Sequence, residues 1–128
     1  MSNIEIIQEL YSAVREKDYE AFRKICTLDL KWIQNAGFPN GATHYGVNAV
    51  IKGVFEVLHD DWDSWQFQIE EYLNAGHSIA VLGFYEGVHK ISQKSFRSSA
   101  AHVFDVSDGK VARFRQFADT KVIWNAII

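Results

Sequence analysis

The sequence predicts an α+β domain in which N-terminal helices pack on one face of a curved, mostly antiparallel sheet. In the first half of the chain, apolar residues recur at the three- and four-residue spacing of amphipathic helices. From Ser64 onward, apolar and polar residues alternate with a period of two, as strands do. A group of helices followed by a group of strands indicates the α+β class. The length of 128 residues suits a single domain over 1–128.

The first two helices are predicted from their caps. Ser2-Asn3-Ile4-Glu5 has the spacing of a capping box, and an apolar stripe continues from it to about residue 16. Asp18 can cap a second, short helix whose apolar side consists of Tyr19, Phe22 and Ile25. We therefore expect a helical hairpin at the N-terminus.

The middle of the chain holds a strand, a loop and a third helix. Leu28–Gln34 is rich in strand-forming residues, so we predict a short strand there. Asn35–Gly46 contains three glycines and the only proline, which is typical of a loop. Over residues 47–59 the apolar residues follow the helical period, which predicts an amphipathic helix.

Four antiparallel strands are predicted after this helix. The first is Ser64–Leu73, and the second, Ile79–Ile91, is apolar on both faces in its first half, which suggests a central position in the sheet. Two long strands then form a hairpin within Ser98–Asp119. Asp119 can cap a last helical turn over Lys121–Ile128.

The turn of this hairpin, Ser107–Gly109, allows two registers. A two-residue loop would place His102 opposite Arg115. A three-residue loop with a bulged glycine would place Ala100 opposite Gln116, with His102 diagonal to it on the same covered face. Because only the second register separates the charged residues from the apolar ones, we predict the three-residue loop.

Composition and charge exclude several classes of function. The net charge is −3 and the basic residues are dispersed, so no nucleic-acid partner is expected. Cys26 is the only cysteine and the histidines lack ligand spacing, so we expect no metal and no other cofactor. The N-terminus does not have the pattern of a signal peptide, and no apolar run reaches about 20 residues. We therefore expect a cytoplasmic protein with no membrane partner.

Aromatic residues make up 14% of the chain, which suits an apolar cavity lined by rings. Each ring could equally belong to the ordinary core. Asp119 has two interpretations, a helix cap or an acid at the mouth of the cavity. The candidate lining residues are Trp32, Phe38, Phe55, Trp62, Phe84, Tyr85, Asp119 and Trp124.

The order of these elements, together with the strand GFYEG (83–87) and the hairpin AHVFDVSDGKVARFRQFADT (101–120), resembles the SnoaL-like branch of the NTF2-like superfamily. This branch is related to ketosteroid isomerases and polyketide cyclases. The resemblance covers nearly the whole chain and implies the cone-shaped, cystatin-like fold of that superfamily. The same scaffold hosts enzymes, binders and accessory subunits, so the resemblance implies a fold more specifically than a function.

The catalytic pattern of these relatives is only partly present. The cyclases place a histidine on the penultimate strand and an aspartate base fourteen residues later, and the corresponding residues here are His102 and Gln116. Ketosteroid isomerases have an aspartate base after the first strand, where this chain has Gln34 and Asn35. Their tyrosine donor corresponds to Leu10 or Tyr11. Amides therefore stand at both positions where the family has a carboxylate.

The resemblance implies a pocket for a small hydrophobic ligand, such as a steroid-like or polyketide-like molecule with a carbonyl. An isomerase or cyclase would use His102 as acid or base, with Tyr11, Asn35 and Gln116 as hydrogen-bond donors to an enolate oxygen. His102 could instead be a core histidine hydrogen-bonded to Gln116 or Tyr85. The alternative function is a non-catalytic binding or dimeric accessory module.

A homodimer is predicted through the outer face of the sheet. In the predicted register, Val103 and Phe117 share that face with Arg113 and Arg115. This is an unusually apolar exposed surface for a monomer.

Overall fold

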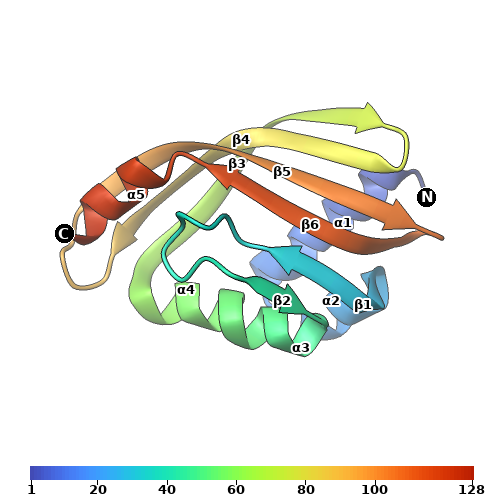
Figure 1. Cartoon of the computed structure of the whole chain (residues 1–128), viewed down its shortest axis with the longest axis horizontal. Coiled ribbons are helices and arrows are strands. Elements are labelled where there is room, and N and C mark those ends of the chain that lie inside the picture. Colours follow the sequence, from blue (N-terminus) through green and yellow to red (C-terminus); the bar gives the residue numbers. More distant parts are fainter.

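The computed structural model describes residues 1–128 and has helices on one side of a curved six-stranded sheet (Figure 1). No helix is both long and apolar enough to cross a membrane. The elements are α1 (Asn3–Glu16), α2 (Tyr19–Ile25), β1 (Cys26–Ile33), β2 (Thr43–Tyr45), α3 (Val47–Val50), the π-helical segment η1 (Ile51–Phe55), α4 (Glu56–Asp61), β3 (Trp62–Ala75), β4 (Ser78–His89), β5 (Ser95–Ser107), β6 (Lys110–Ala118) and α5 (Thr120–Ile127).

The sheet has the strand order β2-β1-β6-β5-β4-β3, and only the β1–β6 pair is parallel. In Figure 1, α1 and α2 lie behind the sheet, and the helix formed by α3, η1 and α4 lies below it. The α+β class and the layer arrangement predicted from the sequence are confirmed. The strand β2 was not predicted, because it has only three residues and lies within the expected loop.

The predicted caps explain where the first two helices begin. The Glu5 amide donates to Ser2 Oγ at 3.1 Å, and the Ser2 amide donates to Glu5 Oε1 at 3.0 Å, so the capping box is present. The Asp18 carboxylate accepts from the Ala21 amide at 3.2 Å at the start of α2. Between the two helices, Lys17 adopts a left-handed conformation with φ 56° and ends α1.

The third helix was predicted over 47–59 and extends from Val47 to Asp61, with η1 in its centre. Gly53 lies in η1, and a Cβ atom there would collide with the imidazole of His44. The glycine therefore lets β2 approach the helix closely. A π-helical segment is rare and is often found near functional sites.

The hairpin register differs from the prediction. Asp108 and Gly109 form a two-residue turn with φ 51° and 76°. A bulge lies between the Asp105–Arg113 pair and the Val106–Val111 pair. The predicted three-residue loop is therefore wrong. The bulge changes the register by one residue, so His102 lies directly opposite Gln116 rather than diagonal to it. Both side chains remain on the covered face, as predicted.

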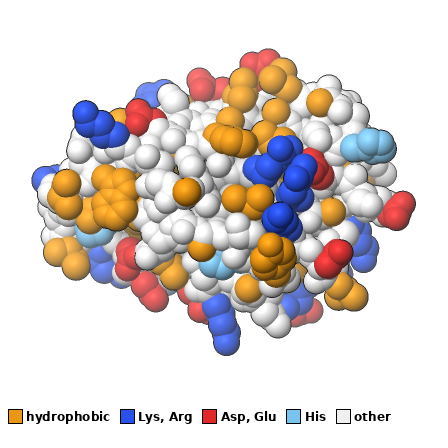
Figure 2. Space-filling model, in the orientation of Figure 1, with side chains coloured by type: hydrophobic (Ala, Val, Ile, Leu, Met, Phe, Trp, Pro, Cys, Tyr) orange, Lys and Arg blue, Asp and Glu red, His pale blue; other side chains and the backbone are white.

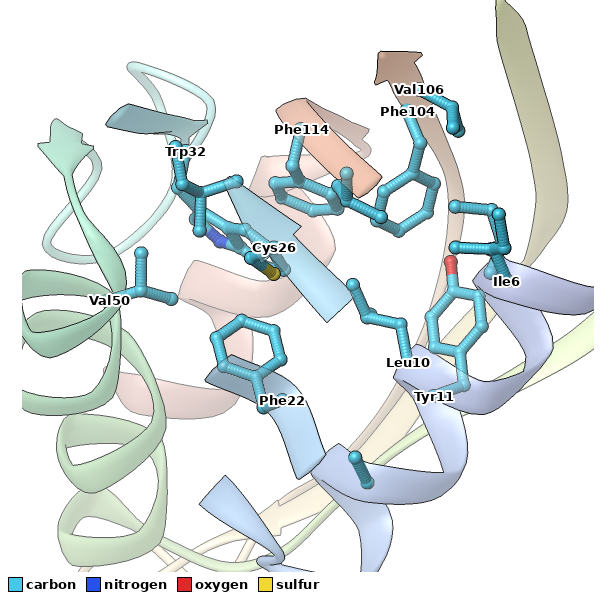
Figure 3. Packing of buried hydrophobic residues seen from close by; sticks show 14 of the residues in the cluster. Ile6, Leu10, Tyr11, Phe22, Cys26, Trp32, Val50, Phe104, Val106 and Phe114 are labelled. Carbon is cyan, nitrogen blue, oxygen red and sulfur yellow. The ribbon is translucent and has the colours of Figure 1, made fainter. Parts of the chain in front are cut away.

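The larger core cluster fills the space between the helices and the inner face of the sheet (Figure 3). Fully buried side chains from α1, α2, β1 and the hairpin meet there, and Figure 3 shows Tyr11 reaching from α1 toward the sheet. Phe104 is 0% exposed and contacts the rings of Trp32 and Phe114. A smaller second cluster packs α5 against the other end of the sheet.

We predict that Phe104→Ala lowers the free energy of unfolding by about 3–5 kcal/mol, because the substitution leaves a cavity in a close-packed core. Urea denaturation followed by circular dichroism measures this change. The control is Leu28→Ala, at a side chain that is fully exposed, where the change should stay within about 0.5 kcal/mol. Equal effects of the two substitutions would contradict the assignment of the core.

Candidate functional site

A cavity of about 910 Å³ lies between the helices and the inner face of the sheet, and most of its lining residues are hydrophobic. Its walls come from α1, α2, η1, α4 and the strands β1, β3, β4, β5 and β6. At its inner end are the side chains of Tyr11, Tyr85, His102 and Gln116. This is the only place in the core where several polar side chains from different elements meet inside a cavity.

A chain of hydrogen bonds connects these polar groups. Tyr11 Oη lies 2.6 Å from His102 Nδ1, and Tyr85 Oη lies 2.5 Å from His102 Nε2. Gln116 Nε2 donates to Tyr85 Oη at 2.9 Å, and Gln116 Oε1 accepts from the backbone amide of Asn35 at 3.0 Å. Four strands or helices and one loop therefore contribute to a single network.

The direction of donation in this hydrogen-bond network follows from the Asn35 backbone amide at one end. A backbone amide can only donate, so Asn35 fixes Oε1 of Gln116 as the acceptor and turns Nε2 toward Tyr85. Tyr85 is the more deeply buried of the two tyrosines, at 4% exposed against 9% for Tyr11, so we assign the Tyr85 hydroxyl as the donor to His102 Nε2. In this assignment His102 carries its proton on Nδ1 and donates to Tyr11 Oη. The hydroxyl proton of Tyr11 is left without a partner in the protein and is available to the cavity.

Burial keeps the side chains of this hydrogen-bond network uncharged. Desolvation lowers the pKa of His102 to about 3, so the imidazole is neutral at neutral pH. Desolvation also raises the pKa of Tyr85 above its ordinary value, although the Gln116 hydrogen bond opposes this. The pKa of Tyr11 is raised by desolvation first and by the neighbouring tyrosines second. The site is thus suited to donating hydrogen bonds rather than to accepting a proton.

Aromatic rings hold the imidazole in place. Phe67 stacks on His102 with ring centroids 4.0 Å apart, and Phe114 contacts its edge at 4.8 Å. Trp32 stacks on Phe114 at 3.9 Å, and its Nε1 donates to Gln34 Oε1 at 3.1 Å. The inner cavity is therefore bordered by flat, rigid surfaces.

The structure brings together most of the residues predicted to form the site. Those that line the cavity are Tyr11, Trp32, Phe55, Trp62, Tyr85, His102 and Gln116. The interpretation of His102 as a histidine hydrogen-bonded to Tyr85 agrees with the geometry, and Tyr11 is a second partner that the sequence did not suggest. A pKa of about 3 makes His102 a poor general base at neutral pH.

Five predicted residues lie outside the cavity. The Asn35 side chain donates to the Ala118 carbonyl at 3.5 Å, and only its backbone joins the network. Phe84 points to the opposite face of β4, where the guanidinium of Arg97 lies over its ring. Phe38 is buried in the second cluster, next to the cavity residue Tyr85.

The other two residues are at the C-terminal end. Trp124 is 41% exposed, and its indole donates to the Gly37 carbonyl at 2.8 Å. Asp119 is exposed at the N-cap position before α5 but makes no side-chain capping bond, so neither of its predicted roles is seen. Its backbone carbonyl instead accepts from Ser98 Oγ at 2.7 Å.

Several lining residues were not predicted. Gln34, which directly follows β1, and Phe67 of β3 both point inward, and strand alternation from Trp32 and Trp65 could have indicated both. Polar residues at the outer end, among them Arg15, Lys17 and His59, come from separate helices. No sequence signal relates them, because their meeting depends on how the helices pack.

We predict that the free energy of unfolding depends on pH through His102. The unfolded chain binds a proton with a pKa of about 6.5 and the folded chain only near pH 3, so stability falls as pH decreases below about 6.5. Between pH 7 and pH 5 the wild type should lose about 2 kcal/mol more than His102→Gln, which cannot titrate. Urea denaturation at each pH measures this difference, and parallel curves for the two proteins would contradict it.

Comparison with known proteins identifies relatives with the same fold. The chain is 30% identical to an NTF2-like protein from Burkholderia thailandensis E264, with a TM-score of 0.92 and coverage of 97% of this chain and 95% of that one. TerC, crystallised with polyporic acid, is 22% identical with a TM-score of 0.86, and the match covers 98% and 97% of the two chains. A protein from Jannaschia sp. CCS1, described as a SnoaL-like polyketide cyclase, is 18% identical with a TM-score of 0.85, covering 98% and 90%.

Curated proteins gave no significant match in a sequence comparison. The family description that matches is the SnoaL-like domain, over residues 7–114. This range extends from α1 to β6 and includes Tyr11, Tyr85 and His102 of the hydrogen-bond chain. The chain is therefore a member of the SnoaL-like domain family and has the NTF2-like fold.

Proposed function

We propose that this protein binds a small, flat, apolar molecule that carries a carbonyl, and that the Tyr11 hydroxyl donates a hydrogen bond to the carbonyl oxygen. The single observation that carries this proposal is the buried hydrogen-bond network on the cavity wall, whose assigned direction leaves the Tyr11 hydroxyl proton without a partner in the protein. A buried donor without a partner costs free energy, and a ligand oxygen would remove that cost.

The hydrogen bonds that link Tyr11 to His102, Tyr85 and Gln116 make its hydroxyl a stronger donor. His102 donates to the Tyr11 oxygen, so negative charge that develops on this oxygen is stabilised. Gln116 and the Asn35 amide hold Tyr85 and His102 in the orientation that makes this possible. In this scheme Tyr11 contacts the ligand, whereas His102, Tyr85 and Gln116 are positioning residues.

An isomerase or cyclase reaction is the first candidate function. Proton transfer next to a carbonyl passes through an enolate, and a preorganised donor in a dry cavity stabilises the enolate oxygen more than the ketone oxygen. Two solved structures with the same fold are described as SnoaL-like polyketide cyclases from Jannaschia and Shewanella. They support the reaction class by analogy of fold.

Non-catalytic ligand binding is the second candidate function, and one observation favours it. The inner cavity has no carboxylate: the positions where relatives carry an acidic base hold Gln116 and the Gln34–Asn35 pair. A glutamine cannot accept a proton at neutral pH, and His102 is a weak base for the reason given above. In this case the same donor would orient a ligand without turning it over.

We predict that the carbonyl stretch of 2-acetylnaphthalene shifts to lower frequency on binding to the wild type and that Tyr11→Phe removes this shift. Phenylalanine keeps the ring but removes the donor, so the dissociation constant should rise about three- to tenfold. Infrared difference spectra and fluorescence titration measure the two quantities. Phe55→Tyr is a matched control, because it adds a hydroxyl to a ring elsewhere in the cavity lining.

Gln116→Glu tests the direction of donation in the hydrogen-bond network with the same infrared assay. A carboxylate accepts from both the Asn35 backbone amide and the Tyr85 hydroxyl, which would reverse the direction of the hydrogen bonds. The Tyr11 hydroxyl would then donate its proton to His102. The carbonyl shift should therefore shrink although Tyr11 is intact. An unchanged shift in both variants would show that Tyr11 is not the donor.

Exchange of the acetyl protons of the bound ketone in D₂O separates the two candidate functions. Exchange that is faster with the wild type than with Tyr11→Phe, followed by proton NMR, would establish proton transfer next to the carbonyl. Binding with the infrared shift but without accelerated exchange would establish the non-catalytic function.

We further propose that two copies of this chain associate through the outer sheet face. Figure 2 views this face and shows hydrophobic side chains next to a group of basic ones. Leu82, Ala101 and Phe117 form one row across β4, β5 and β6, and Phe117 is 51% exposed. A two-fold axis along this row would bury the apolar side chains of both copies.

Charge complementarity about this row supports a second copy as the occupant. Arg97 and Asp105 lie four residues on either side of Ala101 on the same face of β5, so the axis would set Arg97 of one copy opposite Asp105 of the other, which also pairs with Arg113 and Arg115 of its own chain. Arg115 and Asp119 flank Phe117 in the same way. The buried Nε of Arg115 has no hydrogen-bond partner within the chain.

We predict that light scattering at micromolar concentration gives twice the 14.7 kDa mass of the chain. Phe117→Lys should give a monomer, because a charge in the centre of the face cannot be buried without a partner. The control Ile91→Lys, at an exposed side chain in the β4–β5 turn, should remain dimeric. A monomeric wild type would refute the association.

A further inference from the structure

We infer that the mouth of the cavity binds a carboxylate of the ligand, so that the natural ligand is an aromatic or polycyclic acid with a carbonyl at its other end. The inference rests on the proposed function, because it concerns the outer end of the same cavity. Three nitrogen-bearing side chains carry it, those of Arg15, Lys17 and His59. Their placement, hydrogen bonding and lack of counter-ions all indicate an anion.

These residues meet across the mouth from two helices. Arg15 lies in the last turn of α1, Lys17 immediately follows that helix, and His59 belongs to α4. Lys17 Nζ is 3.2 Å from His59 Nδ1. The ammonium can only donate, so Nδ1 is the acceptor and the imidazole proton is on Nε2. Lys17 and His59 thus keep further N–H groups that can donate to a carboxylate.

The two cations have no anionic partner in the protein. All three ion pairs of the structure involve other cations, namely Arg23, Arg113 and Arg115. Asp63 is the only acidic residue in the cavity lining, and its Oδ2 accepts from Gln93 Nε2 at 2.7 Å. Its carboxylate is therefore occupied by the β4–β5 turn. No carboxylate of the cavity lining forms an ion pair with Arg15 or Lys17.

Interaction with the helix dipole does not explain the whole arrangement. A cation near the C-terminus of a helix is favourable, which accounts for Arg15. Lys17, however, has a positive φ of 56°, at a place where glycine is the common residue. A lysine backbone in this conformation is strained by about 1 kcal/mol. From this position the Lys17 side chain reaches His59 of α4.

The spacing along α1 defines the ligand. Tyr11 and Arg15 are four residues apart, so they lie on the same helix face with a rise of about 6 Å between them. We choose a fused bicyclic ring as the probe scaffold, because it is flat and can carry a carbonyl and a carboxylate at opposite ends.

The test compares 6-acetyl-2-naphthoic acid with its neutral isostere, 6-acetyl-2-naphthamide, by fluorescence titration. The wild type should bind the acid about five- to tenfold more tightly than the amide, as expected for two largely exposed ion pairs. The preference should decrease as the salt concentration rises from 50 to 500 mM, because exposed charges are screened. The double variant Arg15→Gln with Lys17→Gln should bind the acid and the amide equally.

Lys24→Gln is the matched control, because Lys24 is an exposed cation of α2 that does not line the cavity. It should retain the preference for the acid. Equal affinities of the wild type for the two compounds, or a preference that survives the double variant, would overturn the inference while leaving the proposed carbonyl site intact. If neither compound binds, the proposed function is wrong and the inference fails with it.

Discussion

Burial of a neutral histidine between two tyrosines is the constraint on which the rest of this structure depends. His102 is fully enclosed by the sheet, α1 and the ring of Phe67, so both of its ring nitrogens need partners inside the protein. Tyr11 supplies one from the helical layer and Tyr85 the other from the neighbouring strand. The Tyr11 hydrogen bond therefore joins α1 to the sheet, and the two hydrogen bonds together fix the inner end of the cavity.

Much of this arrangement can be predicted from the sequence. Helical periods, the capping box and the cap at Asp18 place α1 and α2, because these signals are local. The hairpin shows a different case: the predicted turn was wrong, yet His102 and Gln116 share the covered face. The bulge after the turn compensates for the shorter loop, and the hydrophobic pattern selects the face whichever turn forms.

Residue type alone was a poor guide to the cavity walls. Phe84 and Tyr85 were both expected there, but neighbours on a strand point to opposite faces, so only Tyr85 reaches the cavity. The side chains of Gln34 and Asn35 point in different directions for the same reason. The Gln34 side chain enters the cavity, whereas Asn35 contributes only its backbone amide to the network. The cations at the mouth were not predictable, because they meet only when helices distant in sequence pack together.

The glutamine at 116 does more than remove a base. An amide accepts at one end and donates at the other, so it passes the direction set by the Asn35 amide through Tyr85 to His102 and Tyr11. A carboxylate in the same place would accept at both ends, draw the Tyr85 proton toward itself and require His102 to accept from Tyr11. Relatives with an acid at this position can use it to take a proton from the ligand. The resemblance places Gln116 of this chain at that position, and in the proposed scheme the Tyr11 proton is free to donate at the opposite end of the network.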